Sequence, residues 1–207
     1  YKDGKLDGKL YDWYENGQRK SEENYKDGKE DGTWVYWQNG QKLSERNYKD
    51  GKLDGKLYDW YENGQKKSEG NYKDGKEYDG KWPEWEENGK IKFERTYNDG
   101  QIKKEEYYKD GKKVIETKYD YYRDGQKKSE ENLKDGKEDG TWINWHENGR
   151  IWSVANYKNG KEDGKVTSWY EDGQIALEGN YKDGKKDGKW TKWHKNGKKK
   201  WNCWGLC

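Results

Sequence analysis

Three groups of residues carry the chemistry that this sequence could perform. The two histidines, His146 and His194, occupy equivalent positions with a whole repeat between them, so strand spacing separates them by about 20 Å and they cannot bind one ligand together. We interpret each imidazole as a substitute for an exposed tyrosine ring. The two cysteines, Cys203 and Cys207, are close enough in sequence to form a small disulfide loop, to cross-link two chains, or to remain thiols.

The third group is a column of glutamates that recurs along the chain. Neighbouring members would lie about 10 Å apart across a sheet, which is too far for an acid and a base that act on one bond. Lysines flank nearly all of them, so we expect a solvated outer face with salt bridges. The column consists of Glu22, Glu45, Glu69, Glu94, Glu130 and Glu178.

Motifs for metals, phosphates and activated nucleophiles are missing from the sequence. A structural zinc site needs four ligands, whereas Cys203, Cys207 and the nearby His194 supply three at most. The chain has no Asp-x-Asp-x-Asp-Gly calcium loop, no Gly-x-x-x-x-Gly-Lys sequence followed by Ser or Thr, as a phosphate loop requires, and no Gly-x-Ser-x-Gly nucleophile motif. We therefore predict no catalytic residue, no metal and no cofactor, and we predict that the protein is not an enzyme.

The elements that position these residues must be built without an ordinary aliphatic core. Only nineteen of the 207 residues are Leu, Ile, Val or Phe, whereas 14 Trp and 19 Tyr supply large apolar surfaces. Acidic and basic residues are interleaved and leave a net charge of +2, which argues against a nucleic-acid partner. No apolar run is long enough to span a bilayer, so no transmembrane segment is expected.

The turns come from Asp-Gly and Asn-Gly pairs, which favour positive φ and are strong hairpin signals. All of the 27 glycines except Gly70, Gly179 and Gly205 follow an aspartate or an asparagine. Their spacing predicts an all-β fold, an elongated single antiparallel β-meander of about eight hairpin units of about 24 residues, with about sixteen strands. The repeats are expected to occupy residues 1–200, with an irregular half-unit around 97–107, and residues 201–207 to form a cysteine-containing tail.

One strand of most units is rich in tryptophan, and several carry two tryptophans three residues apart, such as Trp34 and Trp37. Because three is an odd spacing, either a β-bulge brings both rings to one face or the sheet is aromatic on both faces. The other strand alternates, and Ile91, Phe93 and Tyr97 are expected to share a face. We expect most rings to bury one another. The candidate aromatic ladder consists of Trp13, Trp34, Trp37, Trp60, Trp82, Trp85, Trp142, Trp145, Trp169, Trp190 and Trp193.

These units resemble the MORN repeat, and most closely its bacterial variant, whose units run Asn-Gly-Lys, Gly-x-Trp and Asn-Gly-Gln. The segment from Asn24 to Gln41 shows the pattern, with Asp-Gly-Lys in place of the first motif. The resemblance covers nearly the whole chain and implies an elongated, twisted sheet of stacked hairpins that serves as an interaction scaffold, with bacterial members often labelled antitoxin-like. It brings no catalytic residue. The Trp-rich strand, the stretch Tyr97–Tyr122 and the cysteine tail depart from the commoner pattern.

The leading hypothesis is a non-catalytic scaffold that binds a protein partner or a surface. One alternative is a structural subunit whose terminal edge strands pair head to tail and form a filament. A second alternative is adhesion to glycans through the tryptophan and tyrosine rings. The chain has no methionine, even at position 1, so we expect that a segment has been removed. Together with the two cysteines, this favours an extracellular or cell-surface location over the cytoplasm.

Overall fold

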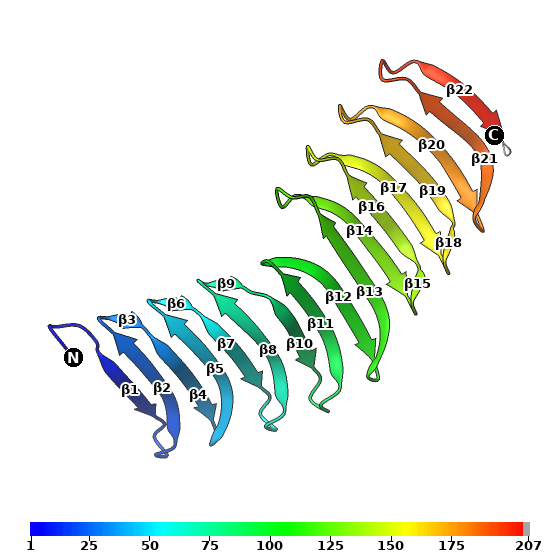
Figure 1. The fold of residues 1–207 in the computed structure, drawn as a ribbon. Coiled ribbons are helices and arrows are strands. Elements are labelled where there is room, and N and C mark those ends of the chain that lie inside the picture. The colour runs from blue at the N-terminus through cyan, green and yellow to red at the C-terminus, as the bar shows by residue number, and fades with distance from the viewer. Residues whose placement is uncertain (205–207) are drawn as a thin grey trace. The chain divides into compact units, whose positions relative to one another are not determined.

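The computed structural model describes residues 1–204, which form strands and turns and include no helix that could cross a membrane. The chain divides into two compact units. Unit 1 comprises Tyr1–Ile102 and Tyr108–Lys112, and unit 2 comprises Lys103–Tyr107 and the residues from Lys113 onward. Each unit is a meander of antiparallel hairpins that follow one another in chain order (Figure 1). The predicted all-β fold of tandem hairpins is confirmed.

The strands of unit 1 pair with their neighbours along the chain, and the division between the units falls within β12. These strands are β1 (Gly8–Trp13), β2 (Arg19–Lys26), β3 (Lys29–Glu30), β4 (Gly32–Gln38), β5 (Gln41–Lys49), β6 (Lys52–Leu53), β7 (Gly55–Trp60), β8 (Lys66–Lys73), β9 (Lys76–Glu77), β10 (Gly80–Trp85), β11 (Ile91–Asn98) and β12 (Gln101–Lys109).

Unit 2 repeats the same arrangement, and its last described strand includes Trp201–Trp204, which pair with β21. The strands are β13 (Lys112–Tyr121), β14 (Lys127–Lys134), β15 (Lys137–Glu138), β16 (Gly140–Trp145), β17 (Ile151–Lys158), β18 (Lys161–Glu162), β19 (Gly164–Trp169), β20 (Ile175–Lys182), β21 (Lys185–Trp193) and β22 (Lys199–Trp204).

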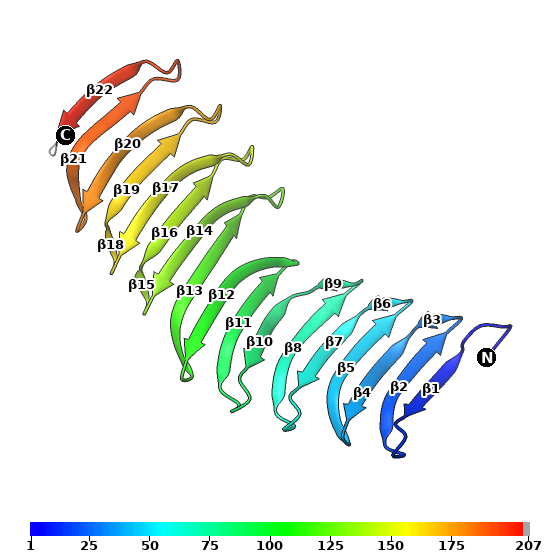
Figure 2. The same ribbon diagram turned by 180° about the vertical axis from the view of Figure 1, so that it is seen from behind.

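The described part of the chain has 22 strands rather than about sixteen, because most of the aromatic strands are interrupted near their start. Gly32, with φ of 97°, breaks the ladder between β3 and β4, and the Asp31 N–H donates to the Asn24 carbonyl oxygen at 2.9 Å. The additional strands β3, β6, β9, β15 and β18 have only two residues each. Each of them directly follows a two-residue turn at one end of a hairpin, as β3 follows Asp27-Gly28 and β18 follows Asn159-Gly160 (Figures 1 and 2).

The Asp-Gly and Asn-Gly pairs form turns of two different geometries. In the Asp27-Gly28 type both residues have positive φ, 51° and 83°, as a two-residue hairpin turn of type I′ requires. In the Asn16-Gly17 type only the glycine has positive φ, and its N–H donates to the Tyr14 carbonyl oxygen at 2.9 Å. The Asn16 side-chain oxygen accepts a hydrogen bond from the N–H of Gln18 at 3.0 Å, which closes this longer turn.

A register shift beside the second tryptophan decides which face each ring occupies. Trp34 pairs with Arg46, Tyr36 with Ser44, and Trp37 with Lys42, so the extra residue lies in β5 and the alternation within β4 is unbroken. Trp34 and Trp37 therefore point to opposite faces, and the sheet is aromatic on both faces. Every tryptophan-bearing hairpin shows the same shift.

The shift makes one predicted face assignment wrong. Phe93 pairs with Glu84, whereas Ile91 pairs with the next residue, Trp85, because Lys92 is the extra residue of this bulge. Ile91 thus lies on the face opposite to Phe93 and Tyr97. Phe93 and Tyr97 are buried, with 6% and 5% of their surfaces exposed, and Ile91 is half-buried.

Candidate functional site

One face of each unit, which we call the tyrosine face, is built from rings that pack on one another. Trp34 lies between Tyr25 and Tyr48, with ring centroids 5.1 and 5.0 Å apart. Trp142 lies 4.7 Å from Tyr157 in unit 2. These offset and tilted pairs supply the apolar area that aliphatic residues supply in ordinary cores. The prediction that rings bury one another is confirmed on this face.

The opposite face, which we call the salt-bridged face, carries the glutamate column. Lys42 contacts the Glu45 carboxylate at 2.8 Å, and its Nζ also lies 5.4 Å from the centroid of the Trp60 ring in the next repeat. The predicted salt bridges are confirmed, and they occur at all six glutamates of the column. Glu94 is not solvated as expected, because it is only 6% exposed beneath Lys81, at 2.6 Å.

The candidate aromatic ladder is thus split between the two faces. The tyrosine face holds four of its members and the salt-bridged face holds seven, and the binding role of the ladder stays a prediction. On the tyrosine face are Trp34, Trp82, Trp142 and Trp190; on the salt-bridged face are Trp13, Trp37, Trp60, Trp85, Trp145, Trp169 and Trp193.

His146 joins neighbouring repeats through a contact with the backbone. Its Nε2 lies 3.0 Å from the Trp169 carbonyl oxygen. Tyr14 and Tyr170 donate equivalent hydrogen bonds from their hydroxyl groups to the Trp37 and Trp193 carbonyl oxygens, at 2.9 and 2.7 Å. The interpretation of His146 as a tyrosine substitute is therefore confirmed, although the ring is half-buried rather than exposed.

Neither the histidines nor the acidic residues assemble into a metal centre where the structure describes the chain. Among residues 1–204, no group of three or more His, Cys, Asp or Glu side chains is placed to hold an ion. The predicted cysteine link falls outside this region, since Cys207 and the side chain of Cys203 are not among the described parts.

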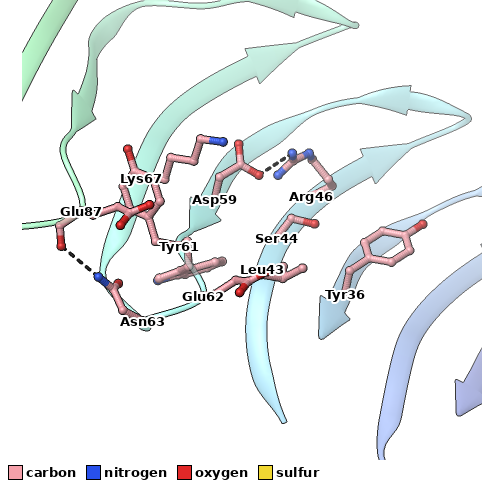
Figure 3. Close-up of a pocket in the computed structure, with 11 residues that line it drawn as sticks. Tyr36, Leu43, Ser44, Arg46, Asp59, Tyr61, Glu62, Asn63, Lys67 and Glu87 are labelled. Carbon is pink, nitrogen blue, oxygen red and sulfur yellow. Dashed lines mark hydrogen bonds and ion pairs between the residues drawn. The ribbon is translucent and has the colours of Figure 1, made fainter. Parts of the chain in front are cut away.

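A large hollow lies in unit 1, across β4, β5, β7 and the turn after β7. Its volume is 710 Å³, and it is open to solvent along the sheet (Figure 3). We call it the unit 1 groove. Aromatic, basic, acidic and amide side chains line it together. The lining residues are Tyr36, Leu43, Ser44, Arg46, Asp59, Trp60, Tyr61, Glu62, Asn63, Lys67 and Glu87.

An ion pair between neighbouring repeats forms one wall of the groove. Arg46 Nη2 lies 2.6 Å from Asp59 Oδ1, and its Nη1 donates to the Tyr58 carbonyl oxygen at 2.9 Å. The second oxygen of Asp59 accepts a hydrogen bond from the Ser68 hydroxyl at 3.0 Å. About a quarter of each charged side chain is exposed, 23% for Arg46 and 26% for Asp59. The pair is therefore held in place while part of it faces solvent.

The far end of the groove is fixed by turn residues. Tyr61 donates from its hydroxyl to the Trp85 carbonyl oxygen at 2.7 Å, and Asn63 Nδ2 donates to the Glu87 carbonyl oxygen at 2.9 Å. Lys67 lies over the Tyr61 ring, with its Nζ 5.7 Å from the ring centroid. These bonds cross from one repeat to the next, so the groove walls are tied to the backbone.

Tyr36 at the near end of the groove is a neutral phenol at physiological pH. Burial, together with the Glu23 carboxylate to which its hydroxyl donates at 3.3 Å, raises the pKa of Tyr36 to about 12. Tyr25 donates to the same carboxylate at 3.1 Å, and burial and that bond raise its pKa to about 12 as well. Both phenols act as donors to one acceptor at neutral pH.

We expect the stability of unit 1 to fall as the pH rises from 10 to about 12, and to fall less steeply in Tyr36→Phe. The folded state holds the Tyr36 proton more tightly than the unfolded state, so its contribution is complete below pH 10 and is lost as the pH rises through the folded pKa. Urea unfolding at a series of alkaline pH values checks this. The free energy of unfolding falling equally steeply with pH in both proteins would contradict this prediction. Lysine deprotonation affects both proteins alike, so it does not alter the comparison.

Six segments of the chain match the family model described as MORN repeat variant: residues 6–27, 30–50, 53–74, 78–99, 138–159 and 162–183. Together they cover more than half of the chain. The chain belongs to the MORN repeat variant family. The MORN family is a non-catalytic repeat family, so this MORN chain is a repeat scaffold. Four of the groove-lining residues, Tyr61, Glu62, Asn63 and Glu87, lie in turns, and the others lie in strands.

Solved structures and curated proteins add little to this MORN assignment. No curated protein matches the chain. A porin-like protein from Bacteroides uniformis is similar at 10% identity and a TM-score of 0.31, with 94% of this chain and 87% of that chain covered. The structures named TcdB2-TccC3-Cdc42 and TcdB2-TccC3-TEV share 12% identity at TM-scores of 0.24 and 0.23, and the alignments span 91% and 93% of this chain. Only 12% of each of those chains is covered, and likenesses at these scores support no inference.

Sequence reasoning missed the groove of this MORN chain because its charged residues come from different repeats. Arg46 occupies the position that Glu23 and Gly70 occupy in the neighbouring repeats. The sequence feature that could have indicated the groove is the change at this one repeat position, from an acidic residue to a basic residue to glycine. Sequence alone did not show that Asp59, on the next strand, would lie opposite it.

Proposed function

We propose that the protein is a non-catalytic scaffold that binds a protein partner through the unit 1 groove. The observation that carries this proposal is the Arg46–Asp59 pair, held by the Tyr58 carbonyl and by Ser68 in an open groove beside Tyr36. Tyrosine, tryptophan and arginine are enriched at the centres of protein interfaces.

The groove favours binding over catalysis on chemical grounds. Its serine, Ser44, has no imidazole among the lining residues to accept its proton, and the Asp59 carboxylate is already engaged by Arg46 and Ser68. The lining instead offers fixed donors and acceptors and three aromatic residues, Tyr36, Trp60 and Tyr61. Side chains that are already ordered lose little conformational entropy on binding, which favours affinity.

Site-specific photo-crosslinking tests this proposal in the cells that make the protein. A photoreactive residue at Leu43, which lines the groove, is expected to give adducts with a partner. The same residue at Lys42, which points to the salt-bridged face over Trp60, is the matched control and is expected to give none with that partner. Arg46→Gln with Asp59→Asn should reduce the adduct at position 43, because it removes the charges of the pair.

The outcomes separate the proposed function from its alternatives. Equal adducts from positions 42 and 43, or none from either, would count against a groove-bound protein partner. Adducts of twice the chain mass of 24.9 kDa would indicate self-assembly instead. A tryptophan fluorescence change on addition of a polysaccharide, lost in Arg46→Gln with Asp59→Asn, would favour a glycan in the groove.

A further inference from the structure

A single position on the salt-bridged face links each repeat to the next, and we call it the cap position. It is the residue opposite the last aromatic residue of the preceding strand, such as Lys127 opposite Tyr121, and its equivalents in unit 1 include Arg19, Lys42 and Lys66. Lys127 reaches the Glu130 carboxylate at 2.9 Å and also lies 5.3 Å from the ring centroid of Trp145 in the following repeat. The cation thus covers a ring and neutralises a carboxylate at once.

The cap position changes character in two successive repeats of unit 2. Ile151 and Ile175 replace the cation, and they are opposite Trp145 and Trp169. In the first of these repeats the glutamate changes as well, because Val154 takes the place that Glu130 holds one repeat earlier. An ion pair is therefore replaced by two apolar residues together.

The isoleucines that replace the cations are not buried in the protein interior. Ile151 is 40% exposed and Ile175 is 38% exposed, and Trp152, next in the chain to Ile151, is 51% exposed. Ile143 and Val154 lie opposite each other on the same face. We call Ile143, Ile151, Val154 and Ile175 the isoleucine patch. Ile151 and Ile175 are exposed and Ile143 and Val154 are half-buried, and apolar residues exposed in a surface that is otherwise charged mark an interaction site.

Unit 1 provides an internal comparison for this change. Ile91 also occupies the cap position there, but it is half-buried and is less exposed than Ile151 and Ile175. Its repeat keeps Glu94, which Lys81 binds at 2.6 Å. A single isoleucine at the cap position therefore leaves the charged pair of the column intact. Only in unit 2 are both members of the pair apolar, with a second isoleucine in the next repeat.

A basic hollow adjoins the isoleucine patch on the same face. It has a volume of 420 Å³, and its lining includes Lys165, Lys189 and Lys199 against one acidic residue, Glu178. Glu178 is opposite Thr167, which in turn is opposite Val154 of the patch. The hollow therefore continues the row of residues that begins in the patch, and its charge is positive.

We infer that the isoleucine patch and the basic hollow together bind an acidic segment of a protein partner, with apolar side chains on the patch and carboxylates at the lysines. This inference rests on the proposed interaction role of the scaffold but not on the unit 1 groove. A hollow suits the side chains of a peptide segment better than the flat surface of a membrane.

Selection from a library of random linear peptides displayed on phage tests the inference with the full chain. Peptides that bind the wild type are expected to combine Leu, Ile or Phe with Asp or Glu. Their affinity, measured by fluorescence anisotropy, should fall by about tenfold or more in Ile151→Lys with Val154→Glu, which restores the charged pair of the other repeats. Lys189→Gln with Lys199→Gln should weaken binding and reduce its dependence on salt.

A matched variant in unit 1 guards against a general effect on the fold. Lys66→Ile with Glu69→Val makes the opposite exchange in the Lys66–Glu69 pair, 2.6 Å apart, and leaves the patch and the hollow unchanged. It should retain the wild-type affinity. The inference is overturned if no peptide is enriched, if the enriched peptides are basic, or if the patch variant binds them as well as the wild type.

Two further outcomes would also decide against it. Vesicles of phosphatidylserine and phosphatidylcholine that bind the wild type but not the patch variant would assign the surface to a membrane. Loss of the peptide in Arg46→Gln with Asp59→Asn would place it in the unit 1 groove. Failure of the patch experiment alone would leave the photo-crosslinking test at Leu43 unaffected.

Discussion

Trp190→Ala is expected to lower the free energy of unfolding of unit 2 by about 3–5 kcal/mol, the range for removing a buried aromatic side chain. Trp190 is only 2% exposed, and its ring packs edge-on against Tyr181 at a centroid distance of 4.9 Å. Lys186 covers the ring, with Nζ 4.9 Å from its centroid. Each repeat contacts mainly its neighbours, so the loss should destabilise the last hairpins first.

Denaturant titration followed by circular dichroism measures this effect without relying on the removed fluorophore. The matched control is Trp152→Ala, since Trp152 is in the same unit but 51% exposed, and it should change the free energy of unfolding by less than about 0.5 kcal/mol. Equal effects of the two substitutions would show that burial at Trp190 does not support the unit. Amide hydrogen exchange can assign the lost protection to β20, β21 and β22.

The turns were predictable from sequence because their chemistry is local. Asp-Gly and Asn-Gly pairs need only their own backbone preferences, and they placed every hairpin of the described chain. The distinction between the two turn types was not visible in the pairs themselves. It depends on whether the turn backbone is closed by a side chain two residues before, as Asn16 does for Gln18.

The assignment of rings to faces was not predictable, because it depends on a residue that has no constant identity. The extra residue of the bulge is Leu43 in one repeat, Lys92 in another and Trp152 in a third. A sequence pattern cannot mark a position that tolerates all three. The odd spacing of the two tryptophans correctly limited the answer to two arrangements, and the ladder of hydrogen bonds chose one.

The candidate sites show the same division between local and nonlocal information. At three members of the glutamate column the pairing follows from a lysine three positions before, as in Lys42 and Glu45, whereas the other three bind lysines of the opposite strand, as Glu94 binds Lys81. The unit 1 groove and the isoleucine patch follow from comparing one column across repeats. Such comparison finds unusual members such as Arg46 and Val154, but the strand opposite each of them is known only from the register.

Two glycines that follow neither Asp nor Asn have a packing role, and they explain why two tryptophan rings lie where they do. Gly70 and Gly179 are in strands with ordinary φ, and a Cβ atom added to either would come closer than 3.0 Å to the ring of Trp82 or Trp190. The ring therefore occupies the space that a side chain would fill. Elsewhere this column holds large residues, such as Glu23 opposite Leu10 and Arg46 opposite Trp34.

The position of the ring over Gly179 also changes its hydrogen bonding. Trp34 donates from Nε1 to the Asn24 carbonyl oxygen at 2.9 Å, and Trp142 donates to the Asn132 carbonyl oxygen at 3.0 Å. Within the described residues, Nε1 of Trp190 is buried and has no such acceptor. The Trp190 ring is therefore held by close packing over Gly179 and not by the Nε1 hydrogen bond that Trp34 and Trp142 make.

Gly179→Ala is accordingly expected to lower the free energy of unfolding of unit 2 by about 1–3 kcal/mol, the usual cost of adding a methyl group to a packed site. The added Cβ must displace the Trp190 ring, which is held by Tyr181 and Lys186, from its place against β20. Denaturant titration with tryptophan fluorescence reports both the stability and the change in the environment of the ring.

The preceding repeat supplies a control for the propensity difference between glycine and alanine. Ala155, opposite Trp142, stands at the equivalent position of the column, and Ala155→Gly should cost about 0.5–1 kcal/mol through backbone entropy alone. If steric overlap decides the outcome, Gly179→Ala destabilises unit 2, even though replacing glycine with alanine lowers the conformational entropy of the unfolded chain, which alone would be stabilising. A Gly179→Ala protein as stable as the wild type would mean that the Trp190 ring can move aside, and that the glycine is not needed for packing.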